Sequence, residues 1–129
     1  MSRKSIHDLG ELQKAIMETV WELGEATTRQ VLERVSRKKP LAYTSVLSIM
    51  QRLENTGWLK HREEGRTYVY QAACSRDEEC CRSLRKFIDR VFHGDSALVF
   101  QHLIEDENLS DEELESLRKL IDKKRIERR

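Results

Sequence analysis

Apolar residues recur at intervals of three and four through the first part of the chain, which places them on one face of successive helices. A first helix is predicted from about Leu9 to Leu23, because Gly24 then provides a stop. A second, shorter helix begins with Thr27-Thr28-Arg29-Gln30, which matches a capping box, and ends before Pro40, whose ring cannot continue a helix. The apolar positions of these two helices are Leu12, Ile16, Met17, Val20, Trp21, Leu23, Val31, Leu32 and Val35.

A third helix, predicted between Leu41 and Gly57, has two different faces. Val46, Ile49, Met50 and Leu53 follow the spacing of a stripe that faces a core. The opposite face carries no carboxylate and is made of Thr44, Ser45, Ser48, Gln51, Arg52 and Asn55. Hydroxyls, amides and one guanidinium on a helix surface predict contact with an anion that also offers hydrogen-bonding edges. DNA is such a partner.

The pattern changes after Gly57. Two runs rich in aromatic and β-branched residues, 58–62 and 67–71, are separated by a short segment that contains Gly65, which is typical of a β-hairpin. A further short strand is expected near residues 25–27. Three helices followed by a hairpin predict a winged helix-turn-helix in residues 1–73.

Residues 74–129 predict three more helices, each apolar on one face. Capping residues occur at Ser75, at Asp95 or Ser96, and at Ser110. Three such helices make a thin core alone, so pairing with a second copy is expected to cover their apolar faces. The fold class is therefore mainly α with a small β-hairpin, and the second domain is a helical dimerisation region. The residues expected to dimerise are Leu84, Phe87, Ile88, Val91, Leu98, Val99, Leu103, Leu117, Leu120 and Ile121.

Charge is distributed unevenly along the chain, although the formal net charge is only +1. Residues 29–66 carry nine basic and four acidic side chains, whereas residues 74–129 carry 12 basic and 14 acidic ones. Phosphate neutralisation drives much of nucleic-acid binding, so a local basic excess around the third helix favours a DNA partner.

Several function classes are disfavoured by the composition. No 18-residue apolar segment and no apolar run near the amino terminus occur, so we expect a cytoplasmic protein without direct membrane binding. No grouping typical of a catalytic centre is evident, so we expect neither enzyme activity nor a cofactor.

The three cysteines, Cys74, Cys80 and Cys81, are expected to be free thiols. Cys81 continues the apolar stripe of its helix and is expected to pack in the core. A thiol- or metal-sensing regulator that uses these three residues is one alternative function.

The residues also resemble a known family. Val20–Thr27, Leu41–Leu53 and Gly65–Tyr70 are similar to the penicillinase-repressor family of transcription regulators (BlaI, MecI and CopY), and the likeness extends over nearly the whole chain. The resemblance implies a homodimeric winged-helix repressor that binds a palindromic operator through its amino-terminal half and dimerises through its carboxy-terminal helices.

The resemblance also implies site residues, position by position. Contacts of the recognition helix would come from Tyr43, Thr44, Ser45, Ser48 and Arg52, and contacts of the wing from Lys60, Arg62, Arg66 and Tyr68. The alternative for Ser48 and Arg52 is that they only solvate the helix surface and do not contact DNA. A winged-helix adaptor that binds protein instead of DNA is the alternative for the whole chain.

The family has two known mechanisms of release from DNA, and the sequence features of both are largely absent from this chain. Copper-responsive members carry paired Cys-x-Cys motifs near the carboxy terminus, and residues 121–129 contain no cysteine. Members that respond to β-lactams are cleaved at an Asn-Phe bond in the dimerisation region, where this chain has His102-Leu103. The sequence leaves open whether a membrane sensor-protease is a partner.

Overall fold

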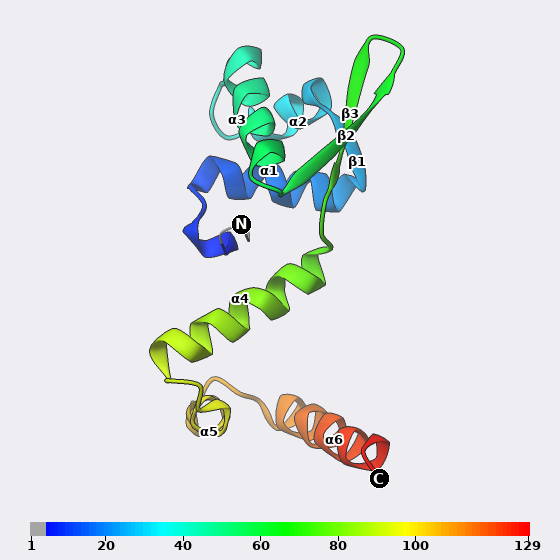
Figure 1. The fold of residues 1–129 in the computed structure, drawn as a ribbon. Helices are drawn as coiled ribbons and strands as arrows, with labels where there is room; N and C mark the ends of the chain where they lie inside the picture. Colours follow the sequence, from blue (N-terminus) through cyan, green and yellow to red (C-terminus); the bar gives the residue numbers. More distant parts are fainter. Residues whose placement is uncertain (1–4) are drawn as a thin grey trace. The chain divides into compact units, whose positions relative to one another are not determined.

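The structure is a computed structural model that describes residues 5–129. Its helices and a small antiparallel sheet confirm the predicted fold class (Figure 1). The elements are a 3₁₀ turn η1 (Ile6–Asp8), α1 (Glu11–Leu23), β1 (Glu25–Thr27), α2 (Thr28–Val35), α3 (Tyr43–Asn55), β2 (Leu59–Glu64), β3 (Thr67–Ala72), α4 (Arg76–Val91), α5 (Ser96–Glu105) and α6 (Asp111–Glu127).

The predicted end of α1 and the predicted start of α2 are both confirmed. Gly24 ends α1 with φ of +83°, a backbone conformation that glycine adopts without a steric penalty. The expected capping box opens α2, because the Thr27 hydroxyl accepts from the Gln30 backbone N–H while the Gln30 side chain accepts from the Thr27 N–H.

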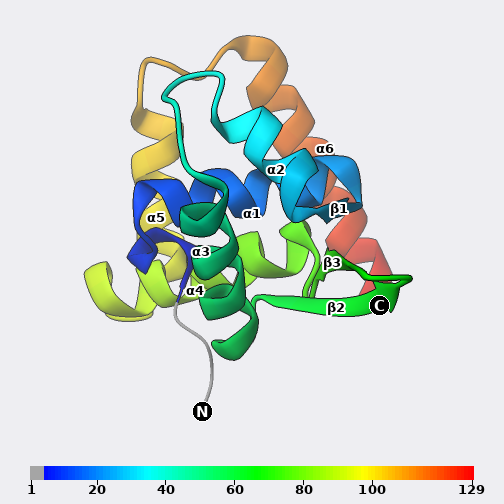
Figure 2. The ribbon, with the colours of Figure 1, turned by 90° about the horizontal axis from the view of Figure 1, so that it is seen from above.

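The sheet has the strand order β1-β3-β2, and both pairings are antiparallel. Leu59 pairs with Ala72 at the base of the hairpin and Glu64 with Thr67 near its tip. Gly65 has φ of +66° and is the first of the two residues that link the strands, a position where hairpin turns favour glycine. Beyond the helices, β2 and β3 continue as a narrow ribbon, and α3 lies at the same end of this part of the molecule (Figures 1 and 2).

One hydrophobic core joins α1, α2, α3 and the sheet. The predicted stripe of α3 is buried, with Val46 and Met50 at 0% and Leu53 at 1% exposure, and Trp58 closes the core at the hairpin base with 0%. The other buried members are Ile16, Met17, Val20, Ala26, Val31, Leu59, Tyr70 and Cys74. Burial of these side chains fixes which face of α3 remains outside.

The chain forms two compact units, residues 1–86 and 87–129, and α4 belongs to both. In the first unit, the buried Glu79 carboxylate on α4 accepts from the Ile6 backbone N–H at 3.0 Å and from the Ser83 hydroxyl at 3.0 Å. The start of α4 therefore packs with the winged-helix part. The sequence placed a domain boundary between residues 73 and 74 from the end of the hairpin, and the assignment of functions to the two halves stays a prediction.

The carboxy-terminal helices begin where the capping residues predict. Ser75 caps α4 and Ser110 caps α6, each reciprocally with the Glu three positions later, and Asp95 rather than Ser96 caps α5 by accepting from the Leu98 N–H. No helix within residues 5–129 is long and apolar enough to cross a membrane.

Candidate nucleic-acid interface

The outer face of α3 is exposed and uncharged except for one guanidinium. Tyr43, Thr44, Ser45, Ser48 and Arg52 are all exposed on it, because the buried stripe turns them outward. Glu54, the one acidic residue of α3, is half-buried and contacts the Nδ1 atom of His61 on β2. The exposed surface thus keeps hydrogen-bonding groups without a carboxylate among them.

The hairpin is attached to the carboxy-terminal end of α3. The Trp58 backbone N–H donates to the Leu53 carbonyl at 2.8 Å, and His61 contacts Glu54. The His61 ring also stacks on Tyr68 of β3, with ring centres 4.1 Å apart and planes 15° from parallel. These contacts hold the predicted wing and the predicted recognition helix in one arrangement.

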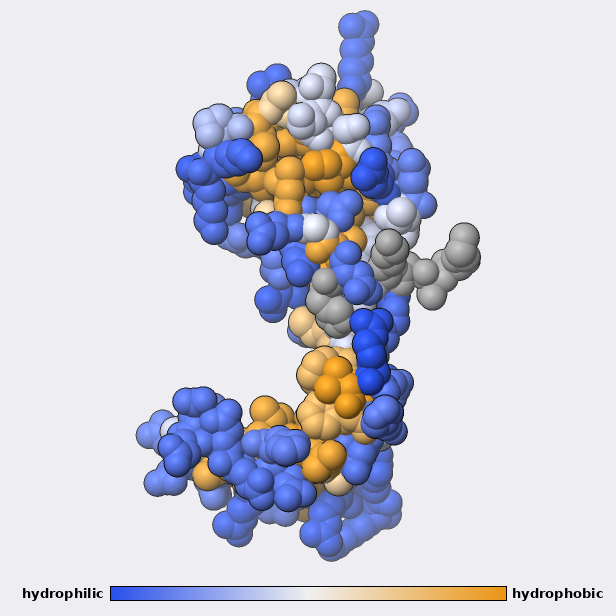
Figure 3. Space-filling model, turned by 90° about the vertical axis from the view of Figure 1, so that its left-hand side faces the viewer, coloured by the Kyte–Doolittle hydropathy of each residue, from blue (hydrophilic) through white to orange (hydrophobic). Residues whose placement is uncertain are grey.

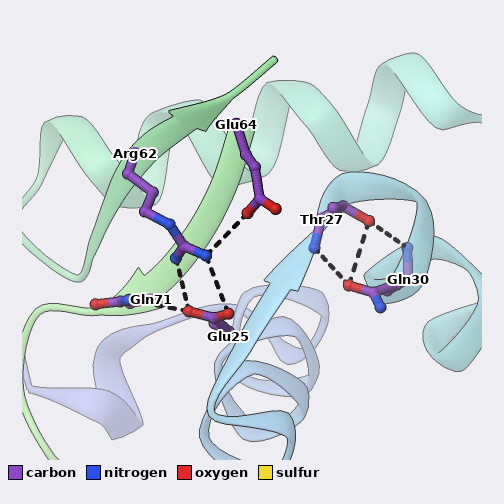
Figure 4. A network of polar contacts seen from close by, with 6 residues as sticks. All are labelled: Glu25, Thr27, Gln30, Arg62, Glu64 and Gln71. Carbon is purple, nitrogen blue, oxygen red and sulfur yellow. Dashed lines mark hydrogen bonds and ion pairs between the residues drawn. The ribbon is translucent and has the colours of Figure 1, made fainter. Parts of the chain in front are cut away.

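Arg62 is engaged within the sheet (Figure 4). Its guanidinium donates to both oxygens of Glu25 on β1, at 2.6 and 3.1 Å, and to Glu64 at 3.0 Å, and Gln71 donates to Glu25 at 3.1 Å. The hydrogen bond from Arg62 is the largest of the causes that lower the pKa of the Glu25 carboxyl, and the same bond raises the pKa of Arg62. The expected DNA contact of Arg62 stays a prediction, but its donors already face two carboxylates.

A groove of about 680 Å³ lies between the start of α2, the outer face of α3 and the hairpin. It brings together three of the predicted site residues, Tyr43, Arg66 and Tyr68, and adds residues that the sequence did not single out. Its lining consists of Thr27, Thr28, Arg29, Tyr43, Leu47, Gln51, Arg66, Thr67 and Tyr68. The guanidinium carbon of Arg29 lies 5.7 Å from the centre of the Tyr43 ring, within the range of a cation–π contact.

The capping box places Arg29 in the first turn of α2 but does not indicate what it contacts. Thr27 and Gln30 hold the first turn of α2, and Figure 4 shows their reciprocal bonds. A residue at position 29 of this first turn is exposed in the structure. Arg29 lies close to Tyr43 because α2 packs against α3. No residue spacing in the sequence predicts this packing.

Apolar side chains are exposed along the carboxy-terminal helices. Ile88 and Val99 are buried, at 4% and 8% exposure, whereas most of the other residues expected to dimerise lie at the surface. Figure 3 shows hydrophobic side chains gathered there among hydrophilic ones. The exposed large apolar residues of α4, α5 and α6 are Leu84, Phe87, Val91, Leu98, Phe100, Leu103, Ile104, Leu120, Ile121 and Ile126; Leu117 is half-buried.

The cysteines correct one expectation. Cys81 is exposed, so its predicted place in the core is wrong for the single chain: the core of this unit is completed by other residues, and α4 turns Cys81 away. Cys74 is buried and Cys80 is exposed, and none of the three cysteines forms a disulfide. Within residues 5–129, no cluster of three or more His, Cys, Asp or Glu could hold a metal ion.

The positions that correspond to the family's cleavage site lie within a helix. His102 and Leu103 belong to α5, and Leu103 is 50% exposed. The His102 ring packs near Phe92, with ring centres 5.9 Å apart. A protease would have to unwind this helix to bind the bond in an extended form.

Comparison with known proteins decides the family. The sequence profile described as "Penicillinase repressor" matches residues 9–123, which is most of the chain. The chain belongs to the penicillinase repressor family. The match covers both the winged-helix unit and the helices that follow it. Both units are therefore part of the family's common architecture.

Relatives of this penicillinase repressor family member support the assignment. It is 20% identical over 118 residues to the methicillin resistance regulatory protein MecI of Staphylococcus aureus strain N315, and the match covers 92% of this chain and 96% of MecI. It is 37% identical over 71 residues to the transcriptional regulator BlaI of Mycobacterium tuberculosis strain H37Rv, covering 54% of this chain and 51% of BlaI.

Solved structures show the same fold. The solution structure of the DNA-binding domain of the repressor BlaI aligns with a TM-score of 0.50 and 23% identity, covering 58% of this chain and 92% of that domain. RosR of H. salinarum aligns with a TM-score of 0.53 and 14% identity over 95% of this chain and 98% of RosR. The fold of the first unit is therefore a winged helix, as predicted.

Proposed function

We propose that this family member is a homodimeric transcriptional repressor that binds a palindromic DNA operator in the cytoplasm. The observation that carries the proposal is the exposed face of α3, which has hydrogen-bonding side chains, one guanidinium and no carboxylate beside an anchored hairpin. Such a helix offers donors and acceptors to base edges in a major groove.

The proposed reading residues are Ser45, Ser48 and Arg52 on α3, with Tyr43 and Thr44 at its start. Hydroxyls bond several base edges, and a guanidinium can donate two hydrogen bonds to guanine. Lys60, Arg66 and Tyr68 of the hairpin would contact the sugar-phosphate backbone, which sets the register of α3 without reading sequence.

The proposed dimer uses the apolar surfaces of α4, α5 and α6. Leu120, Ile121 and Ile126 are 63%, 55% and 65% exposed, an arrangement that is unfavourable in water unless a partner covers it. A second copy with twofold symmetry is the commonest solution for a soluble protein. It would present two copies of α3 to two half-sites.

Proteolysis in α5 is one candidate for the step that releases the protein from DNA. Proteolysis in α5 would require the bond between His102 and Leu103, which lies in a formed helix and differs from the family's Asn-Phe. Thiol sensing is a second candidate for release, because Cys80 and Cys81 are both exposed on α4.

Selection of bound fragments from a random DNA library, performed with the purified full chain at two salt concentrations, tests the proposal. We expect an enriched palindrome whose half-site centres lie about 10 base pairs apart or somewhat more. Binding that shows no enrichment and disappears at the higher salt would contradict a sequence-specific repressor and favour a protein-binding adaptor.

A further inference from the structure

The groove beside α3 has the electrostatic character of an anion site. Its lining holds two guanidiniums, those of Arg29 and Arg66, and hydroxyls from threonine and tyrosine, but no carboxylate. Another hollow of the same unit, of about 730 Å³, is lined by Glu18, Glu22 and Glu78 with one arginine. The two grooves have similar volumes, but one lining is basic and the other is mainly acidic. A basic lining is therefore not a general property of grooves in this unit.

Arg29 and Arg66 differ in their surroundings from four arginines of this unit that form ion pairs, Arg34, Arg62, Arg76 and Arg82. Both are exposed, and neither forms an ion pair within the part of the chain that the structure describes. Arg62 instead donates to Glu25 and Glu64, and Arg34 donates to Glu22 at 2.9 Å. The guanidinium donors of Arg29 and Arg66 thus remain available to a ligand.

Tyr43 supports the guanidinium of Arg29. With 5.7 Å between the guanidinium carbon and the ring centre, the ring face attracts the cation without occupying its N–H donors. Tyr43 is 43% exposed at the start of α3, so the pair lies at the border between the groove and the predicted reading surface. An arginine held in this way loses less side-chain freedom when it binds.

We propose that this groove holds the sugar-phosphate backbone of one DNA strand, with Arg29 and Arg66 donating to phosphate oxygens from its two sides. Planar guanidiniums bond phosphate oxygens in pairs, which suits the chemistry of this ligand. The inference rests on the proposed DNA binding and extends it: the backbone would be clamped from α2 as well as from the hairpin, and Arg29, not Arg62, would be the second backbone arginine.

Salt dependence distinguishes such a backbone contact from base reading. The full-length variant Arg29→Ala is compared with wild type on the selected operator and on a scrambled duplex, at several salt concentrations. We expect its affinity at 0.1 M salt to fall about tenfold on both duplexes, and the slope of log K against log salt to become shallower by about 0.9. Arg29→Lys should restore the slope and only part of the affinity, because lysine keeps the charge and loses the planar fork.

Arg34→Ala is the matched control, since it removes an arginine from the same helix whose donors face Glu22. We expect wild-type affinity and slope from it. A wild-type slope in Arg29→Ala, or a loss confined to the operator, would overturn the clamp while leaving DNA binding intact. If wild type bound neither duplex, the proposed function itself would fail together with this inference.

Discussion

At the scale of single residues, the proposed interface combines two kinds of contact that respond differently to substitution. Residues that read bases affect one position of a DNA site, whereas residues that neutralise phosphates affect every sequence alike. The outward side chains of α3 belong to the first kind in our proposal, and the cationic side chains of the hairpin and α2 to the second.

Ser48→Ala tests the reading role. Loss of its hydroxyl should cost about 1–3 kcal/mol at one operator position and relax the preference there, while binding to random DNA stays unchanged. Competition binding against single-base operator variants measures this. Ser116→Ala, which removes an exposed serine from α6, is the control. Equal losses of Ser48→Ala on operator and random DNA would reject the reading role.

Lys60→Ala tests the backbone role of the hairpin. Since lysine acts on a phosphate as a point charge, the variant should bind all duplexes more weakly by one factor and lower the salt slope by about 0.9. Titrations at three salt concentrations measure the slope. Lys123→Ala, on the exposed surface of α6, should keep the wild-type slope. A change of sequence preference in Lys60→Ala would assign this residue to base reading instead.

Much of this surface could be predicted from the sequence, because the apolar stripe of α3 determines which residues face outward. Arg62 and Arg29 show where sequence reasoning ends. Glu25 lies 37 positions before Arg62, and only the pairing of both strands with β3 brings the two together. Arg29 approaches Tyr43 through helix packing. Exposure of Cys81 likewise depends on how α4 is rotated, which an approximate stripe does not fix.

At the scale of elements, the wing depends on its turn and on the contacts that tie its strands together. Capping boxes and the glycine positions predicted most helix boundaries correctly, and the short β1 lies where a third strand was expected. The register of β3 between β1 and β2 was not predictable, because it follows from burial of Tyr70 and Trp58 in a shared core.

Gly65→Ala tests the turn. Its φ of +66° disfavours a Cβ atom, and no atom lies within 4 Å of the added carbon, so the cost is a backbone cost of about 1–2 kcal/mol in the free energy of unfolding. Gly10→Ala is the matched control, since its φ of −65° suits any residue and its new Cβ makes an ordinary contact. We expect the control to lie within about 0.5 kcal/mol of wild type in urea unfolding. Equal stabilities of the two variants would contradict the strained turn.

The contact between Glu25 and Arg62 predicts a pH dependence. Because the pKa of Glu25 is lowered in the folded state, its stabilising effect is present above the unfolded value of 4.5 and is lost as the pH falls through the folded value. The stability advantage of wild type over Glu25→Gln should therefore be present at pH 6 and shrink toward pH 3. A difference that stayed constant over this range in urea unfolding would contradict the role of this ion pair.

At the scale of the whole molecule, one recognition helix can contact only a few base pairs, so the proposed function needs two copies. The apolar surfaces of the carboxy-terminal helices were predicted from their stripes, although Phe100 and Ile126 were missed. How two chains place two winged helices depends on side-chain packing between copies, which neither periodicity nor composition encodes.

Substitution of Leu120 and Ile121 together by glutamate tests the dimer. Four charges in the proposed twofold interface should leave the single chain of 15.3 kDa as the main species, whereas we expect twice this mass for wild type. Sedimentation equilibrium measures the mass. Lys119→Glu, at the neighbouring exposed position, should remain a dimer. An unchanged mass in the double variant would place the interface elsewhere.

In the proposed complex, two copies of α3, held by one dimer, read two half-sites on one face of the duplex. The most direct test of this arrangement is the affinity of the full chain for the selected palindrome and for the same palindrome with five base pairs inserted at its centre. The insertion turns the second half-site by about half a helical turn. We predict a loss of affinity of at least about tenfold, down to that of a single half-site, because half of the specific contacts are removed. Equal affinity for both duplexes would contradict this arrangement.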